Sequence, residues 1–339
     1  INFHKCDLIP IHVHEEDAQK VAIALSCGLG AFPLKYLGFP LHYTKLRRED
    51  LQPVVDKVLK KAAGWRGRLL GYEKKLVLVQ SCLASIPTYL MSMIKFPKWS
   101  INLINSQMAH CFWDNYEGHH KYHLANWGLV NQKKQYGGLG IPNIAEMNLS
   151  LLASWVYKFH NDGNKMWKQI VDSKYRANNP NIFSCPDTNS SPFWKGVLWA
   201  AKAAKHGYQW KVGNGKRVKF WEDHWFGSCS LAIQFWDLYV IANEHNQTVA
   251  DLWDGVNLKI TFRRCVDNRL LLLWYDLLSI LQTTVFSDED DALIWKLESN
   301  GVYSVSSMYA MVNFRGISPI PIPDIWKLHD PPHIHIFMA

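Results

Sequence analysis

The stretch Phe32-Pro33-Leu34-Lys35-Tyr36-Leu37-Gly38-Phe39-Pro40-Leu41-His42-Tyr43 joins two apolar runs through a Leu-Gly pair. Glycine tolerates the backbone of a tight turn, so this pattern predicts a strand or turn around Gly38. The residues that follow are rich in lysine and arginine. We therefore expect the turn to lead into a helix that faces nucleic acid.

That helix is expected to begin at Asp50, which can cap it, and to tolerate Pro53 in its first turn. Gly64 is expected to end it. Its apolar residues repeat at i, i+3, i+4, i+7 and i+8, which predicts one buried face: Leu51, Val54, Val55, Val58 and Leu59. The opposite face carries Lys57, Lys60 and Lys61.

Positive charge is concentrated in this part of the chain. Residues 45–98 hold twelve Lys/Arg and four Asp/Glu, so their net charge is 12 − 4 = +8, equal to that of the whole chain. A second basic run, 195–219, has seven Lys/Arg and no acid, whereas 220–339 has seven basic and fifteen acidic residues. Two basic patches indicate an anionic partner, although solvated helix faces explain the same pattern equally well.

Length and composition limit the class of protein. A chain of 339 residues fits two or three domains, and 48% hydrophobic with 19% charged residues indicates a globular protein. Sixteen tryptophans predict cores rich in large aromatic side chains. No apolar run is long enough for a membrane span. Seven scattered cysteines without a Cys-x-x-Cys pair favour a reducing compartment, the cytoplasm or nucleus.

Further elements follow from periodicity and turn signals. A strand end and a helix starting at Glu15-Glu16-Asp17 are expected before residue 31, with Val21, Ala24 and Leu25 at helical spacing. Other helices are expected at 72–86, 100–113 and 146–160. Asn-Gly pairs predict β-hairpins over 210–220 and 293–305, followed by a helix from Ser306. The acidic run 288–291 is interpreted as a helix start and 316–333 as a Pro-rich connection.

A series of motifs runs through nearly the whole chain in order. It comprises Asn2-Phe3-His4-Lys5-Cys6, Phe32–Gly38, Gly64–Leu70, Ser85–Ser92, Gly137–Ile141, Ser191–Gly196, Lys211–Lys216, Phe220–Trp225 and Ile325–Leu328. Together these resemble the C-terminal half of the plant non-LTR (LINE-type) retrotransposon reverse transcriptase, with the lead-in to its reverse-transcriptase zinc-binding domain. Because the chain lacks an initiator Met and stops within an apolar pattern, we expect it to be a fragment.

The resemblance implies an α+β fold with four parts. These are a palm remnant with a primer-grip-like turn at 1–44, a helical thumb at 45–118, a helical connector at 119–190 and, at 191–339, a Trp-rich region with β-hairpins that leads into an incomplete zinc-binding domain.

The resemblance also implies contacts with nucleic acid. Lys5 would lie near the incoming triphosphate, where a cation can neutralise the leaving pyrophosphate, or be an exposed strand-end lysine. Arg66 and Arg68 flank Trp65 and suit phosphate contacts, while Trp65 either stacks on a base or anchors the core. The expected nucleic-acid-binding residues are Lys5, Lys35, Tyr36, Leu37, Gly38, Lys57, Lys60, Lys61, Arg66 and Arg68.

No catalytic residue is expected in this chain. Polymerases hold two divalent ions with palm carboxylates, commonly in an aromatic-x-Asp-Asp turn. The adjacent pair Asp290-Asp291 lies within the acidic run 288–291, where position 288 is Asp rather than aromatic, far beyond the thumb. Two Cys/His groups, Cys111 with His119, His120 and His123, and Cys6 with His12 and His14, lack a recognised zinc spacing. Magnesium and zinc are therefore expected only in the full-length protein.

The expected function is thus that of a polymerase fragment. It would bind an RNA/DNA primer–template duplex without incorporating nucleotides by itself. The alternatives are a degenerate or co-opted protein-interaction module, and the C-terminal part of an intact polymerase made as a longer precursor. The sequence leaves the oligomeric state open.

Overall fold

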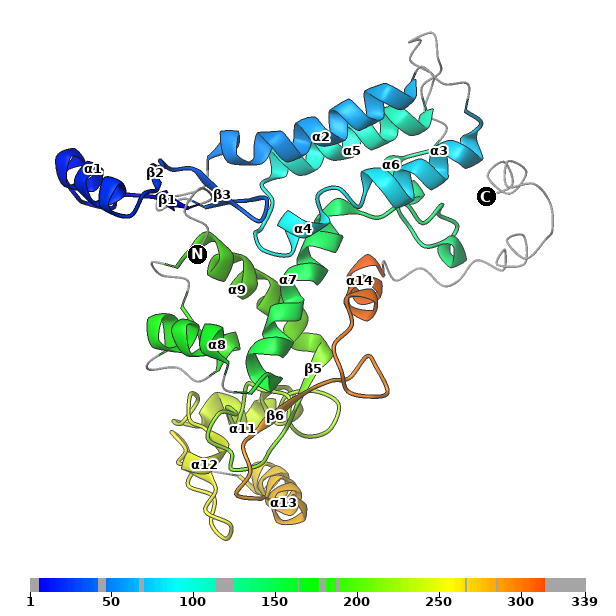
Figure 1. Cartoon of the computed structure of the whole chain (residues 1–339). Coiled ribbons are helices and arrows are strands. Elements are labelled where there is room, and N and C mark those ends of the chain that lie inside the picture. Colours follow the sequence, from blue (N-terminus) through cyan, green and yellow to red (C-terminus); the bar gives the residue numbers. More distant parts are fainter. Residues whose placement is uncertain are drawn as a thin grey trace.

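The computed structural model describes residues 6–41, 47–66, 70–113, 125–163, 165–176, 181–186, 190–265, 267–284 and 286–314. Within these ranges helices dominate, and the strands form three separate two-stranded sheets (Figure 1). At this coarse level the predicted α+β class is confirmed.

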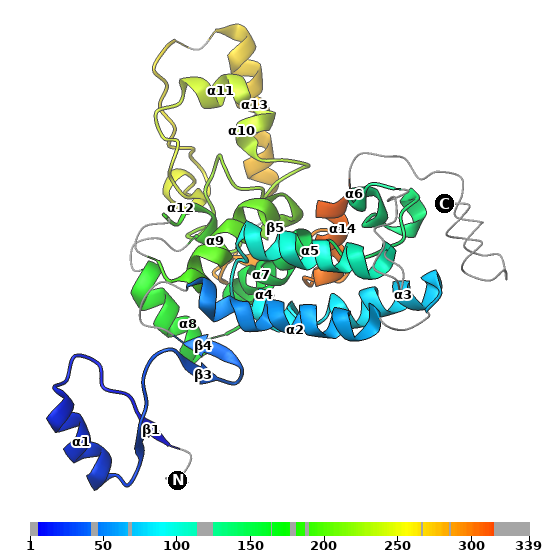
Figure 2. The same ribbon diagram turned by 90° about the horizontal axis from the view of Figure 1, so that it is seen from above.

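The N-terminal part forms an arm that projects from the helical body (Figures 1 and 2). Strand β1 (Asp7–Leu8) pairs in parallel with β2 (Gly28–Leu29), and α1 (Glu15–Ala24) connects them. The predicted strand and helix are thus confirmed. The helix buries Ala18 and Ala22, while Val21 and Leu25, two of the three residues noted at helical spacing, remain 45% and 47% exposed.

The opening stretch forms a hairpin of β3 (Leu34–Tyr36) and β4 (Phe39–Leu41). Tyr36 pairs with Phe39, so the loop has two residues, Leu37 and Gly38, both with positive φ. Such a loop matches the twist of the two strands and favours glycine, which agrees with the predicted turn.

Two long helices, α2 (Arg48–Arg66) and α5 (Lys98–Trp113), pack side by side after the hairpin. Helix α2 begins two residues before Asp50, whose carboxylate accepts the Arg47 N–H at 2.7 Å, and it continues past Gly64. Its fully buried residues are Leu51, Val55, Val58 and Ala62, with Val54 and Leu59 half-buried beside them. The predicted apolar face is therefore confirmed, but not the predicted ends.

The expected helix at 72–86 is present in two pieces. Helix α3 (Tyr72–Leu78) runs into a π-helical turn at Val79–Leu83, and α4 (Thr88–Met91) follows. The expected helix at 100–113 corresponds to α5.

Helix α7 (Ile144–Asn161) is the centre of the molecule, packed against α5, α9 (Pro192–Ala204) and α14 (Val305–Asn313) (Figure 1). It corresponds to the helix predicted at 146–160. Its buried Asn148 donates to the carbonyls of Met91 and Ile94 and accepts the Phe96 N–H. These bonds fix the connection between α4 and α5 onto α7.

Most of the remaining elements complete a second core, which is rich in tryptophan, whereas α6 (Trp127–Val130) packs against the core that α2 and α5 share. Sequence patterns predicted neither α9 nor α13 (Asn268–Thr283), although Ser191 caps α9 and Pro192 is its first residue. The other elements are α6 (Trp127–Val130), α8 (Met166–Val171) with a π-helical turn at Asp172–Arg176, β5 (Tyr208–Lys211), α10 (Leu231–Gln234), α11 (Trp236–Ile241), α12 (Val249–Leu252), α13 (Asn268–Thr283), β6 (Ala292–Trp295) and 3-10 turns at Lys134–Tyr136, Ile182–Ser184 and Lys205–Gly207.

Both predicted hairpins of the C-terminal half are wrong. Strand β5 pairs with the distant β6, antiparallel, with Tyr208 opposite Trp295, and not with the residues after its Asn-Gly turn. Segment 288–291 starts no helix, because it leads into β6. The helix expected from Ser306 is confirmed as α14. The domain boundaries stay a prediction, and the Pro-rich segment 316–333 lies outside the described residues.

Candidate nucleic-acid interface

The outer face of α2 presents the three predicted lysines. Lys57, Lys60 and Lys61 are exposed, opposite the buried face that packs on α5. Within the described ranges neither Lys57 nor Lys60 lies within ion-pair distance of a carboxylate. Residues three and four apart are neighbours on a helix surface, so these ammonium groups form one local positive surface. We call Lys57, Lys60 and Lys61 the α2 lysine face.

The β3–β4 hairpin lies beside the N-terminal half of α2 (Figures 1 and 2). Phe39 packs against the core that α2 and α5 share, which attaches the hairpin to this core. At the tip, Tyr36 is 62% and Leu37 is 77% exposed. The structure thus places an aromatic and an aliphatic side chain in solvent at the hairpin tip, whereas Lys57, Lys60 and Lys61 lie in the middle and C-terminal half of α2.

Leu37 occupies the left-handed backbone region at φ 50°, next to Gly38 at φ 81°. For a residue with a Cβ this conformation costs about 1–2 kcal/mol. The exposed leucine therefore occupies a position whose backbone conformation Asn or Gly would adopt at lower free energy. Strained residues of this kind often mark sites of function.

Leu37→Asn is expected to stabilise the fold by up to about 1 kcal/mol, because asparagine tolerates the left-handed region. If the Leu37 side chain contacts nucleic acid, the same variant binds duplex more weakly. Thermal unfolding and duplex titration of the variant and the wild type measure both effects. A loss of stability would show that the leucine makes a contact favouring the fold.

Of the other four predicted residues, two are described only by their backbone and two are not described. Lys35 belongs to β3 and Arg66 ends α2, but their side chains, like that of Trp65, lie outside the described part, as do Lys5 and Arg68 altogether. The structure therefore groups Tyr36, Leu37 and Gly38 at the hairpin tip and, as a separate group, the three lysines on α2.

The second basic run, 195–219, is neutralised in part, at three of its seven Lys/Arg residues. Lys205 Nζ lies 3.4 Å from Asp223 Oδ1, Arg217 Nη2 lies 3.1 Å from Asp290 Oδ2, and Lys219 Nζ lies 3.6 Å from Glu222 Oε2. The four other lysines, Lys195, Lys202, Lys211 and Lys216, are exposed and distributed over α9, β5 and the following loop. The second basic run thus differs from the first, because Glu222, Asp223 and Asp290 pair with three of its cations.

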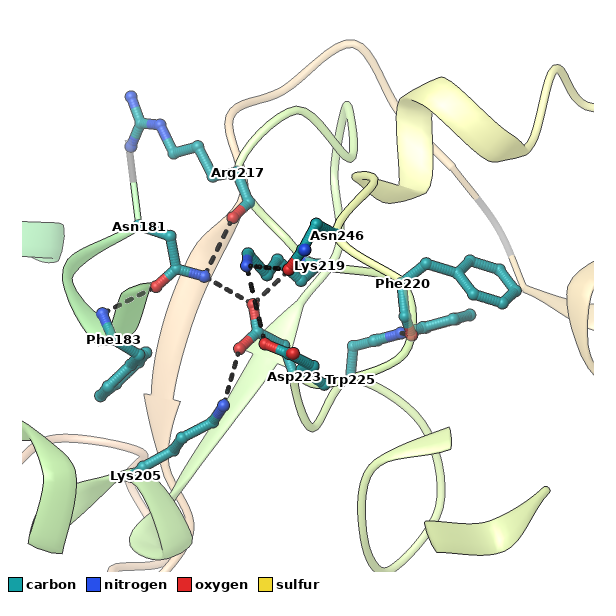
Figure 3. A network of polar contacts seen from close by, with 10 residues as sticks. Asn181, Phe183, Lys205, Arg217, Lys219, Phe220, Asp223, Trp225 and Asn246 are labelled. Atoms are coloured by element: carbon teal, nitrogen blue, oxygen red, sulfur yellow. Dashed lines mark hydrogen bonds and ion pairs between the residues drawn. The ribbon is translucent and has the colours of Figure 1, made fainter. Parts of the chain in front are cut away.

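Asp223 is the centre of a buried polar network (Figure 3). Its Oδ2 accepts the Asn181 Nδ2–H at 2.6 Å and the Lys219 backbone N–H at 2.9 Å. The Lys205 ammonium contacts Oδ1 as an ion pair without hydrogen-bond geometry. Burial raises the pKa of Asp223 above its ordinary value, although Lys205 and the two donors oppose this shift. The network joins the segments around Asn181, α9 and residues 217–223.

Asp290 and Asp291 organise the loop after β5. Asp291 accepts the backbone N–H groups of Gly213, Gly215 and Arg217 at 2.8, 2.8 and 2.9 Å. Asp290 bonds the side chains of Asn214 and Arg217. Both carboxylates thus have a structural role. The sequence analysis missed this role because it interpreted the segment as the acidic start of a helix.

The described residues form neither a metal-binding cluster nor a membrane-spanning helix. No three His, Cys, Asp or Glu side chains gather in metal-binding geometry among the described residues, which include Cys6, His12, His14 and Cys111. His119, His120 and His123 lie outside them. All seven cysteines are described, and none of them forms a disulfide. No described helix has the length and apolar character that a membrane span requires.

Two curated proteins resemble this chain. A protein of Arabidopsis thaliana named "Putative ribonuclease H protein" is 22% identical over 322 residues, which cover 88% of this chain and 49% of that protein. An uncharacterized mitochondrial protein of the same plant is 23% identical over 142 residues, 42% of this chain and 92% of that protein. No protein-family model matches the chain. The chain spans about half the length of the first relative.

These relatives correct the assignment made from sequence motifs. Neither is named as a reverse transcriptase, so the assignment to a plant non-LTR reverse transcriptase is contradicted and is withdrawn. It depended on short turn and aromatic motifs, which fix local backbone shape and core packing rather than one chemistry. Both relatives are plant proteins, in agreement with the expected plant origin.

Proposed function

We propose that this chain is a non-catalytic module that binds double-stranded nucleic acid, with an RNA/DNA primer–template duplex as the expected ligand. The α2 lysine face would contact the phosphate backbone and the tip of the β3–β4 hairpin would lie against the strand. The observation that carries this proposal is that Lys57 and Lys60 are exposed on one helix face without a described carboxylate partner. In the run 195–219, three of the seven Lys/Arg residues form ion pairs and the other four are distributed over α9, β5 and the following loop.

Electrostatics supports such a role. Lysines that contact phosphates release condensed counterions, which gives affinity without sequence preference. The buried face of α2 holds the helix on α5, so the lysines project from a rigid support. One relative is named as a ribonuclease H protein, and a ribonuclease acts on nucleic acid, which supports the same class of partner.

The carboxylates support a role without catalysis. Two-metal phosphoryl transfer needs clustered acidic ligands. Asp290 and Asp291, the adjacent aspartates, are bonded to the loop at 213–217. Binding through lysines and a hairpin tip needs neither magnesium nor zinc. We therefore propose that the chain alone neither extends a primer nor cleaves a strand.

The salt dependence of binding to a blunt duplex tests this function. We expect log K to fall linearly with log salt, with a slope of about −3, roughly −0.9 for each lysine of the α2 face. EDTA is expected to leave the affinity unchanged, because no metal takes part in the contact. Absence of binding, or an affinity that does not change with salt, would contradict the proposal.

Exposed apolar residues favour the second candidate, a protein-interaction module. Trp236 on α11 is 60% exposed, and Leu272 and Tyr275 on α13 are 69% and 63% exposed. Exposed apolar patches often mark protein interfaces. If that were the function of the chain, charge reversal on α2 would leave its interactions unchanged.

A further inference from the structure

Three tryptophans outside the α2 lysine face share an arrangement that the proposed duplex contact leaves unexplained. Each indole is half-buried and has a cation over its ring. The ring-to-cation distances are 4.6 Å for Trp99 and Arg48, 4.3 Å for Trp199 and Lys95, and 4.7 Å for Trp155 and Lys158. The three cationic residues are all exposed.

These pairs lie along one short segment, residues 92–99. The Ser92 carbonyl accepts the Trp155 indole N–H at 2.8 Å, Lys95 covers Trp199, and Trp99 is the last residue of the segment. A Cβ at Gly196 would lie 3.2 Å from the Lys95 backbone nitrogen, so α9 approaches this segment closely. We call Arg48, Trp99, Lys95, Trp199, Trp155 and Lys158 the cation–indole ridge.

The surroundings of Trp99, Lys95 and Trp199 in the ridge are basic. The segments 87–113 and 190–221, which supply Trp99, Lys95 and Trp199, contain no Asp or Glu. Helix α9 adds Lys195 and Lys202, four residues before and three after Trp199, both exposed on the same side of the helix. The N-terminal ends of α9 and α2 lie near each other in both views (Figures 1 and 2). One end of the ridge, at Arg48, therefore lies at the N-terminal end of α2, beside the β3–β4 hairpin.

From this arrangement we infer that the cation–indole ridge binds a single-stranded nucleic acid, as a flank of the duplex held by α2. Successive bases would stack on the indoles and the phosphates would contact the cations and the lysines of α9. The inference extends the proposed function, since it uses the same chemical partner at a separate surface.

The cation–π pairs are weak enough for a base to replace the cation on the indole ring. An exposed cation–π contact contributes only about 0.5–1 kcal/mol, so a base can displace the cation from the ring at low cost. The released Arg or Lys then lies within reach of the phosphate next to that base. Aromatic stacking accepts every base, which predicts binding with little sequence preference.

A duplex with and without a single-stranded extension of about 12 nucleotides, in RNA and in DNA, separates the two surfaces. The wild type is expected to bind the extended duplex about tenfold more tightly than the blunt one. Trp199→Leu should abolish this increment and leave blunt-duplex affinity unchanged. Trp236→Leu, the same change at an exposed tryptophan on α11, should keep the increment. Far-UV circular dichroism confirms that each variant is folded.

The combination Lys95→Gln with Lys158→Gln keeps all three indoles and provides the second variant. It should make the salt slope for the extended duplex less steep by about 2. An increment that is absent in the wild type, or retained in both variants, overturns the inference. If single strands bind and Trp199→Leu weakens that binding, while blunt duplex does not bind at all, the inference about the ridge is supported and the duplex proposal fails.

Discussion

Lys57→Glu combined with Lys60→Glu lowers the affinity for a blunt duplex by about 100-fold at moderate salt, because each change removes a phosphate contact and adds a repelling charge. Both side chains are exposed and make no described ion pair, so the substitutions break no contact of the fold. Stability should change by less than about 0.5 kcal/mol for each substitution. Fluorescence anisotropy with a labelled duplex measures the affinity.

The chain offers a matched control for this change. Lys211→Glu with Lys216→Glu alters the net charge equally, on β5 and the loop that follows it. This control should lower duplex affinity only slightly, through the overall charge. An equal loss in both double variants would mean that net charge, and not the α2 lysine face, decides binding.

Asp223→Ala has the largest expected effect on stability. Asp223 is completely buried, and its loss leaves the Lys219 N–H and the Lys205 ammonium without their acceptor and the Asn181 amide with only its 3.3 Å bond to the Arg217 carbonyl. Removing one partner of a buried ion pair costs about 3–5 kcal/mol. We expect the lower end, about 3 kcal/mol, because the Lys205 side chain is 33% exposed and regains water.

Denaturant unfolding of the variant and the wild type measures this loss. Asp276→Ala removes an exposed carboxylate on α13 and should change the free energy of unfolding by less than about 0.5 kcal/mol. A loss for Asp223→Ala no larger than for this control would show that the network of Figure 3 does not support the fold.

The pH dependence of the same network has a defined sign. Because the pKa of Asp223 is raised in the folded state, protonation of its carboxyl favours folding. This contribution is complete below the ordinary pKa of an aspartate and is lost as the pH rises through the raised value. The Asp223→Asn variant cannot ionise at this position, so it should not lose stability there as the pH rises. Its free energy of unfolding relative to the wild type should therefore increase as the pH rises across this window.

Local patterns predicted the helices well. The apolar residues of α2 repeat within one segment, so the periodicity specified both its buried face and its lysine face. The helix ends were less certain, because Gly64 is compatible with a helix interior when packing elsewhere holds the helix. Helix α7 was predicted for the same local reason, within two residues at its start.

Local sequence patterns did not predict contacts between segments that are distant in the sequence. The Asn214-Gly215 pair is a strong hairpin signal, but Asp291 binds the loop and β6 takes the place beside β5. The charge run 195–219 likewise gave no sign that Asp223 and Asp290 would pair with it. The cation–indole ridge was missed because its six residues come from four separate segments.

The salt dependence of duplex affinity, compared between the wild type and the variant with Lys57→Glu and Lys60→Glu, tests the central claim most directly. If these lysines contact phosphates, the plot of log K against log salt is less steep in the variant by about 2, roughly 0.9 for each contact removed. Equal slopes in the two proteins would contradict the account, because the α2 lysine face would then release no counterions when duplex binds.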